Sequence, residues 1–594
     1  MTSEAVVAEA LKGGGFLIED RSPTAVFTPE DYSEEQRMLA QTGRDFMEKD
    51  VLPKVSQILK LDYEAIRALM RKAGEIGLLA IEVPEEYGGL ALGKVTGCLA
   101  SEISAMEGSW AVAFMGHTGI GSLPITYFGT DEQKAKYLPR FATGEWISSY
   151  SLSEASSASD ALNAKARAVL SPDGASWILN GEKMWLTNAG FADVYITFAK
   201  VDGEKFTAFI IDKGSPGVSL GPEERKLGIK GSSTRPLILQ DAIIPKGNLL
   251  GEIGKGHKIA FNILNIGRFK LGAGVVGGSK CAFKAACEYA QERTAFGKKI
   301  ADFGLIQAKI GEMTARIFAA EAMVYRTAGT IDANLEGVHD NATALKRIED
   351  YDAECSIVKV FGSEVLDFVV DETVQIFGGA GYVEDYPVER YFRDARINRI
   401  FEGTNEINRL LVPGRMVRRA MSGALPLFDA AMALMDEPKG GPRPSDSDHG
   451  FLATEVRLTK GAKKTSLMLL ALAAQTFQAK LQEQQEVLGL FADVAIETYA
   501  LESALLRTQK KAGRDGEAAA LPFATALQVF AEGAVSRIEA SARQALPAIV
   551  DGDMLTTCME AVARYTDRKA LAVIPLRRSL AALSFDKKGY PFGS

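Results

Sequence analysis

The chain has 594 residues, about four times the length of a typical domain, which predicts several domains around a large core. It carries 68 lysines and arginines against 76 aspartates and glutamates, a formal net charge of −8. This balance offers no basic surface to a nucleic acid, so neither DNA nor RNA is an expected partner. With 47% hydrophobic and 24% charged residues, the composition excludes a disordered or fibrous chain.

Membrane spans, disulfides and metal centres are not expected either. The longest uninterrupted apolar run, at 467–474, has 8 residues, whereas a membrane-spanning helix needs about 20. The N-terminus carries Glu4 and Glu9 before its first basic residue, Lys12, unlike a transit peptide or a secretory signal. The 5 cysteines form no C-x-x-C pair and the 4 histidines lie far apart. These features predict a cytoplasmic protein without a metal.

The expected fold class is α+β and mostly helical. After an N-terminal tail at 1–32, helical spacing of apolar residues predicts a helical domain over 33–147. Short β-branched and aromatic runs with Asp-Gly turns then predict an antiparallel, barrel-like sheet domain over 148–254. Helical spacing returns over 255–420, and a stretch that is apolar on nearly every face indicates the centre of a four-helix bundle.

The remainder of the chain reads as a linker and a further helical domain. Residues 421–451 include a run of Pro, Gly, Ser and Asp that cannot bury enough surface to fold, which predicts a linker. Residues 452–594 are rich in Ala, Leu, Gln and Glu and predict a separate helical extension. Within the linker, 425–437 has the apolar spacing of a membrane-surface helix, so peripheral membrane contact and packing within the protein both stay open.

Five strings carry a family resemblance. They are YSLSEASSASDA at 150–161, NGEKMWLTNAG at 180–190, RTAFGKKIADFGLIQ at 293–307, QIFGGAGY at 375–382 and RINRIFEGTNEINR at 396–409. Each string alone is a weak signal. Together, in this order and between helices, sheet and helices, they resemble the acyl-CoA dehydrogenases, which are FAD enzymes. The helical extension resembles that of the very-long-chain subgroup.

Glu402 is the candidate catalytic base. Removing a proton next to a thioester carbonyl requires a base, and burial raises the pKa of a carboxyl group into a useful range. An isolated EGT string would more often mark only a helix start capped by Thr404. The resemblance assigns the abstraction of the α-proton to the matching glutamate, while a hydride passes to the flavin. Some members place the base just before an arginine instead, but here that position is Gly267, before Arg268.

The resemblance also implies the cofactor and substrate contacts. The positions that match FAD contacts are Tyr150, Leu152, Ser153, Trp185, Thr187, Arg293, Phe296, Gln307, Gln375, Gly379, Thr404 and Glu406. The positions that match acyl-CoA contacts are Ser159, Arg268 and Gly403. Without this context Trp185 would more often be a core residue of the sheet. Because the family binds the nucleotide half of FAD mainly with a neighbouring subunit, the resemblance implies a homodimer or a dimer of dimers.

One loop departs from the family pattern. Ser153, Glu154 and Ala155 stand where relatives usually have Thr-Glu-Pro, and Ala158 replaces a glycine. Serine keeps the hydroxyl group, so the flavin contact is expected to survive. Loss of the proline predicts a freer backbone before Ser159, and the added β-carbon of Ala158 narrows the loop. The expected effect of both changes is on the binding of CoA.

The resemblance implies a long-chain acyl-CoA dehydrogenase of fatty-acid β-oxidation. Such an enzyme forms trans-2-enoyl-CoA and passes electrons to an electron-transferring flavoprotein. Long-chain preference is expected from the helical extension and from Gly267, whose missing side chain leaves room for the acyl group. Two alternatives stay open: an acyl-CoA oxidase whose flavin is reoxidised by oxygen, and a non-catalytic scaffold built on the same fold.

Overall fold

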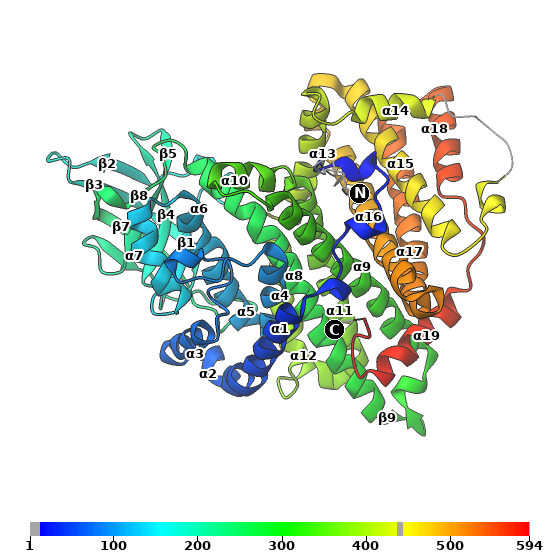
Figure 1. Ribbon diagram of the computed structural model, residues 1–594, viewed down its shortest axis with the longest axis horizontal. Helices are drawn as coiled ribbons and strands as arrows, with labels where there is room; N and C mark the ends of the chain where they lie inside the picture. Colours follow the sequence, from blue (N-terminus) through cyan, green and yellow to red (C-terminus); the bar gives the residue numbers. More distant parts are fainter. Residues whose placement is uncertain (1–11, 436–442, 593–594) are drawn as a thin grey trace, which may run out of the picture.

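The protein was analysed as a computed structural model, which describes residues 12–435 and 443–592. The sheet domain lies at one end, the long bundle helices lie in the middle, and the C-terminal helices lie at the other end (Figure 1). The expected class, α+β and mostly helical, is confirmed, as is the order of helices, sheet, helices and further helices.

The N-terminal helices begin at predictable caps. Ser33 and Thr130 each form a capping box, in which their side chains accept from the backbone of the third helical residue. A π-helical segment, η7 (Gly116–Gly121), connects two of these helices, and such segments are frequent at functional sites. The helices are α1 (Glu34–Phe46), α2 (Val55–Leu59), α3 (Tyr63–Glu75), α4 (Lys94–Ser104), α5 (Gly108–Met115), α6 (Leu123–Phe128) and α7 (Asp131–Ala142).

The sheet domain has a hydrophobic core of its own. Its strands are β1 (Ser148–Ser151), β2 (Arg167–Leu170), β3 (Ser176–Thr187), β4 (Val194–Val201), β5 (Lys205–Asp212), β6 (Val218–Leu220), β7 (Thr234–Pro245) and β8 (Leu249–Leu250). The strand order is β6-β7-β3-β2-β4-β5-β8, with β1 beside β4. Most neighbours are antiparallel as predicted, but β4 pairs in parallel with both β1 and β2. The alternation of apolar and polar residues along a strand does not show whether the neighbouring strand is parallel or antiparallel. These parallel pairs could therefore not be predicted from the sequence.

The central bundle is built on two long helices that run side by side in the same direction. A β-carbon at Gly272 of α8 would lie 2.4 Å from Val358 of α11, and one at Gly362 would lie 2.9 Å from Val275, so glycines permit this close packing. The elements of the bundle are α8 (Gly256–Glu292), β9 (Thr294–Ala295), β10 (Lys298–Lys299), α9 (Gly304–Leu335), α10 (Asn341–Glu349), α11 (Asp352–Phe377), α12 (Val388–Ala395) and α13 (Asn405–Met421).

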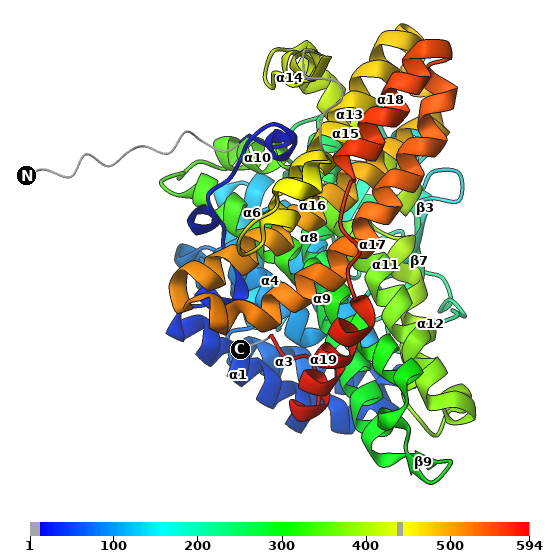
Figure 2. The ribbon, with the colours of Figure 1, turned by 90° about the vertical axis from the view of Figure 1, so that its right-hand side faces the viewer.

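The C-terminal helices pack closely against the bundle. They are α14 (Leu427–Met435), α15 (Ala453–Phe477), α16 (Gln485–Asp515), α17 (Glu517–Ile549), α18 (Gly552–Tyr565) and α19 (Val573–Asp586). Helices α16, α17 and α19 pack against α9 and share one hydrophobic core with the bundle (Figure 2). By length and composition α8 and α17 could each cross a membrane. However, 83% of the most apolar 18-residue stretch of α8 and 56% of that of α17 are buried inside the protein, as in core helices.

Parts of the predicted tail and of the predicted linker also take part in this packing. In the predicted tail, Phe16 is buried and packs edge-on against Tyr499 of α16. In the predicted linker, Leu427 and Ala431 of α14 are buried, and α14 packs on α15. One face of the candidate membrane-surface helix is therefore covered by protein. Residues 436–442, where the Pro- and Gly-rich run begins, lie outside the described residues.

Candidate active site

Glu402 lies in a strained turn just before α13. Its φ is +57° and that of Gly403 is +83°, so two residues in succession adopt the left-handed conformation. A non-glycine residue persists there only when its surroundings hold it in place, which is typical of functional sites. Thr404 ends the turn as the N-cap of α13, with its side chain accepting a hydrogen bond from the Ile407 N–H at 3.3 Å. The turn directs the Glu402 carboxylate toward α8.

The carboxylate of Glu402 is buried and has a free oxygen. A β-carbon at Gly267 would lie 2.6 Å from Oε2 of Glu402 and 3.3 Å from Ile120 of η7, so a side chain here would displace the carboxylate from this position. Oε2 has no hydrogen-bond partner among the described residues. Burial raises the pKa of Glu402 to about 7, although the positive charges of Arg268 and Lys359 act to lower it. A buried carboxylate that titrates near neutrality is suited to general-base catalysis.

Buried cationic and amide groups hold the backbone of this turn. Nε of Arg268 donates to the Glu402 carbonyl oxygen at 3.2 Å. Nζ of Lys359 and Nδ2 of Asn408 donate to the Gly403 carbonyl oxygen at 2.7 and 2.8 Å. Sequence reasoning singled out Arg268 and Gly403 but missed Lys359 and Asn408. A charged residue inside a helix that is apolar on nearly every face was the available signal for Lys359.

Tyr150 brings the sheet domain to the same site. Its ring is buried in β1, and its hydroxyl group has no hydrogen-bond partner among the described residues. Burial raises the pKa of Tyr150, and the negative charge of Glu402 raises it further. Tyr150 is therefore a predicted contact that lies within electrostatic range of the base.

The predicted flavin contacts of β3 lie at one rim of the sheet. The strand pairing of β3 with β7 shifts register between Lys183 and Leu186, and in this bulge Trp185 has a φ of +62° and a side chain that is 52% exposed. The Met184 N–H donates to the Ser153 carbonyl oxygen at 2.9 Å, which fixes Ser153 beside this strand.

Two further contacts with the first strand complete this rim. The Ser149 hydroxyl of β1 donates to the Thr187 carbonyl oxygen at 2.6 Å. Nζ of Lys183 donates to the Leu152 carbonyl oxygen at 3.1 Å, so the chain that leaves β1 is held against β3. The structure thus places Leu152, Ser153, Trp185 and Thr187 on neighbouring segments beside β1, which contains Tyr150.

Glu154 holds the start of the loop that contains Ser159. Glu154 is buried and forms an ion pair with Lys183 at 2.7 Å. Its carboxylate also accepts hydrogen bonds from the backbone N–H groups of Lys165 and Ala166, at 2.5 and 3.0 Å. A buried ion pair thus holds the start of this loop, and Ser159 is exposed.

A second group of predicted FAD contacts lies far from Glu402 in the same chain. Arg268 and Arg293 stand 25 positions apart on and just after α8, a separation of about 37 Å along the helix. Phe296 of the β9–β10 hairpin is 95% exposed, and this hairpin lies at the opposite end of the molecule from the sheet (Figure 1). Gln375 and Gly379 are exposed near the end of α11, and Gln307 begins α9.

A mostly apolar cavity lies along α8, beyond Gly267 in the direction of the chain. It has about 560 Å³ of empty space, counting the part open to solvent, and lies between α5, α8, α11 and α12. Gly274 and Gly278 line it, and their spacing from Gly267 places all three on one face of the helix. The distance from Gly267 to Gly278 is about 16 Å. Opposite this glycine face, the cavity is lined by Ala111 and Leu366.

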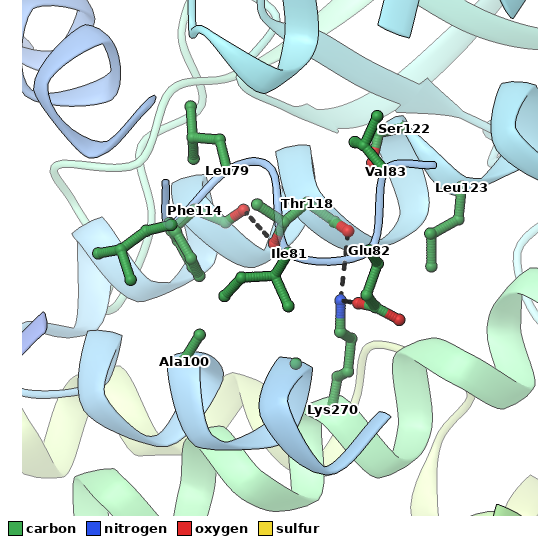
Figure 3. Close-up of a pocket in the computed structure, with 12 residues that line it drawn as sticks. Leu79, Ile81, Glu82, Val83, Ala100, Phe114, Thr118, Ser122, Leu123 and Lys270 are labelled. Carbon is green, nitrogen blue, oxygen red and sulfur yellow. Dashed lines mark hydrogen bonds and ion pairs between the residues drawn. The ribbon is translucent and has the colours of Figure 1, made fainter. Parts of the chain in front are cut away.

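The smaller cavity in Figure 3 is a structural cluster rather than a second site. Glu82 is buried between Lys94, at 2.6 Å, and Lys270, which also donates to the Thr118 carbonyl oxygen at 3.2 Å. Burial favours the protonated acid, but the two ammonium groups outweigh it and lower the pKa of Glu82 to about 2. Because Glu82 stays ionised between two ammonium groups, it offers no carboxyl group that titrates near neutral pH.

Comparison with known proteins agrees with this geometry over nearly the whole chain. Family models described as acyl-CoA dehydrogenase match with their N-terminal domain at 33–145, middle domain at 149–242, C-terminal domain at 254–417 and a second C-terminal domain at 461–564.

Three relatives are informative. A "Probable acyl-CoA dehydrogenase" of Bacillus subtilis is 48% identical over 588 residues, 98% of this chain and 99% of the relative. The crystal structure of an acyl-CoA dehydrogenase complexed with FAD from Bacillus anthracis has 47% identity and a TM-score of 0.95, covering 98% of this chain and 100% of that one. Human mitochondrial very long-chain specific acyl-CoA dehydrogenase is 40% identical over 348 residues, 57% of this chain and 51% of the relative. The chain belongs to the acyl-CoA dehydrogenase family, as its five motifs predict.

Proposed function

We propose that the protein is an FAD-dependent dehydrogenase that converts long-chain acyl-CoA into trans-2-enoyl-CoA in fatty-acid β-oxidation. The observation that carries this proposal is the buried, unpartnered carboxylate oxygen of Glu402, which faces Gly267 and has a pKa of about 7. This oxygen accepts the α-proton of the thioester, and the Glu402 N–H is expected to donate to the thioester carbonyl oxygen as negative charge develops there.

The residues at the rim of the sheet suit a flavin. Trp185 offers a planar apolar surface that is more than half exposed, and the side chains of Thr187 and Ser153 supply hydroxyl groups on the same rim. The relative from Bacillus anthracis, at 47% identity over 98% of this chain, is complexed with FAD. When bound, FAD supplies the acceptor for the β-hydride. The residues near Glu402 therefore fit the isoalloxazine half of this cofactor.

The distant group of contacts supports a homodimer. Arg293 and Phe296 are exposed and stand about 37 Å along α8 from Arg268. Guanidinium groups pair well with pyrophosphate. We infer that these residues serve the nucleotide half of FAD bound by a neighbouring subunit, in a dimer or a dimer of dimers. Sedimentation of the FAD-loaded protein tests this, because a monomer that retains its flavin would contradict it.

The pH dependence of flavin reduction follows from the ionisation of Glu402. Only the carboxylate can accept the α-proton, and the pKa of this group is raised to about 7. We expect kcat/KM for reduction by palmitoyl-CoA to fall as pH drops below about 7, tenfold per pH unit at the limit, since kcat/KM reports ionisation of the free enzyme. A stopped-flow profile that stays flat down to pH 5 would rule out Glu402 as the titrating base.

The cavity along α8 supports the preference for long acyl chains. Ala111 of α5 lines it opposite Gly274, so Ala111→Phe is expected to fill part of the space that the distal acyl chain occupies. We predict a loss of at least tenfold in kcat/KM for palmitoyl-CoA, because several methylene groups lose their apolar contacts at about 0.8 kcal/mol each. Butyryl-CoA is the internal control and should keep its rate. Equal losses for both substrates would place the long acyl chain elsewhere.

The electron acceptor is proposed to be an electron-transferring flavoprotein. The test is reoxidation of the substrate-reduced enzyme under anaerobic conditions with that flavoprotein, compared with reoxidation by dissolved oxygen alone. Fast reoxidation by the flavoprotein and slow reoxidation by oxygen would support a dehydrogenase. The reverse order would identify an oxidase.

A further inference from the structure

Lys359 is a buried lysine behind the Glu402 turn. Its Nζ donates to the Gly403 carbonyl oxygen and to Oδ1 of Asn405, each at 2.7 Å. Neither acceptor carries a formal charge, and no carboxylate among the described residues forms an ion pair with this amine within 4.0 Å. A buried ammonium group without an anionic partner is costly, and proteins that keep one generally use it.

The surroundings of Lys359 connect it to the base. Burial lowers the pKa of Lys359 to about 7, and the nearby charge of Glu402 is the largest influence that opposes this shift. The charged groups that act on Lys359 from the packed elements are Glu402 in the turn, Arg268 of α8, Glu406 of α13 and Glu364 of α11. Those that act on Glu402 are Arg268 and Lys359.

We propose that Lys359 is a positioning residue for Glu402, whose amine holds the left-handed Glu402–Gly403 turn through the Gly403 carbonyl and places a positive charge beside the carboxylate. The inference rests on the proposed role of Glu402 as the base. Arg268 and Asn408 also hold carbonyl oxygens of the turn. The positive charge of Lys359 acts to lower the pKa of Glu402, and the negative charge of Glu402 acts to raise that of Lys359.

The test separates the charge of Lys359 from its hydrogen bond. Lys359→Met removes both, Lys359→Gln keeps a donor without the charge, and Lys359→Arg keeps both. The readout is the infrared band of the protonated Glu402 carboxyl group as a function of pH, assigned by its absence in Glu402→Gln. This band can be measured without turnover. If Glu402→Gln proves fully active, the proposed function fails, but the band still shows whether Lys359 changes the pKa of Glu402.

We expect Lys359→Met and Lys359→Gln to raise the midpoint of this band by about one pH unit or more, since an opposite charge nearby lowers the pKa of a carboxyl group by about 1–3 units. Lys359→Arg should stay close to wild type. The matched control is Lys463→Met, which removes a buried lysine whose partner Glu502 keeps a second cation, Arg326. This control should leave the band unchanged.

The pH dependence of the rate of flavin reduction is a second measurement. It would not change if Lys359 only stabilised the fold. In Lys359→Met and Lys359→Gln the rate of flavin reduction should fall at pH 7 and recover as pH rises, with the change in kcat rather than in KM. An unshifted band in a folded neutral variant, or a rate lost equally at every pH, would overturn the proposal. If Lys359→Met fails to fold, Lys359→Gln decides the result.

Discussion

Glu402→Gln is expected to slow flavin reduction by palmitoyl-CoA by about 10²- to 10⁴-fold, the usual contribution of a general base. The amide has nearly the same shape as the carboxylate, so it still fits against Gly267, but it cannot accept the α-proton. The measurement is anaerobic stopped-flow absorbance of the flavin band under single-turnover conditions. The flavin content should match that of wild type, because the substitution leaves the rim of the sheet unchanged.

Glu354→Gln is the matched control for this variant. Glu354 of α11 is also a buried glutamate whose pKa is raised by burial, and it accepts a hydrogen bond from the Gly14 N–H. A glutamine side-chain oxygen can still accept that bond. The control should therefore reduce flavin at close to the wild-type rate. If Glu402→Gln stayed within tenfold of wild type, another group would have to be the base.

Arg507→Met is expected to lower the free energy of unfolding by about 3–5 kcal/mol, because the Glu30 carboxylate loses its cationic partner, whereas Glu321 keeps Lys280. The Arg507 side chain is fully buried and pairs with Glu30 at 2.5 Å and with Glu321 of α9 at 2.6 Å. It also donates to the Phe592 carbonyl oxygen at 3.2 Å. One guanidinium thus joins the N-terminal segment, the bundle and the end of the chain.

The measurement for Arg507→Met is the midpoint of urea denaturation followed by tryptophan fluorescence. Arg543→Met is the control, because Arg543 forms a surface ion pair with Glu539 of the same helix at 2.9 Å, and such pairs contribute about 0.5 kcal/mol. If both variants unfolded at the same urea concentration, Arg507 would not join the C-terminal helices to the bundle as described.

The sequence predicts the order of the domains well and their packing poorly. Helical and strand periodicities are local, so the helices over 33–147 and the strands over 148–254 could be read directly from them. The packing of the C-terminal helices against the bundle could not be predicted in this way, because it depends on pairs such as Glu30 with Arg507, which lie 477 positions apart. A short N-terminal segment without periodicity gives no sign that its side chains fill a distant core.

Some residues of the candidate site could likewise be predicted from local motifs, whereas others depend on contacts between distant parts of the chain. Glu402 and Trp185 lie in motifs that are contiguous in the sequence, and the structure places both at the site. Lys359 binds the Gly403 carbonyl across 44 positions, and Lys183 binds Glu154 across 29. No local pattern links these partners. For Lys359 the available sign was a lysine within an otherwise apolar stretch, and it becomes interpretable only when the fold shows what the amine contacts.

The most direct test of the proposed function is an anaerobic visible spectrum of the purified protein before and after one equivalent of palmitoyl-CoA is added. The proposed chemistry predicts an oxidised flavin band at the start and its bleaching on addition, as Glu402 takes the α-proton and the flavin accepts the hydride. A protein that holds flavin and binds palmitoyl-CoA without bleaching, or one that holds no flavin, would contradict it.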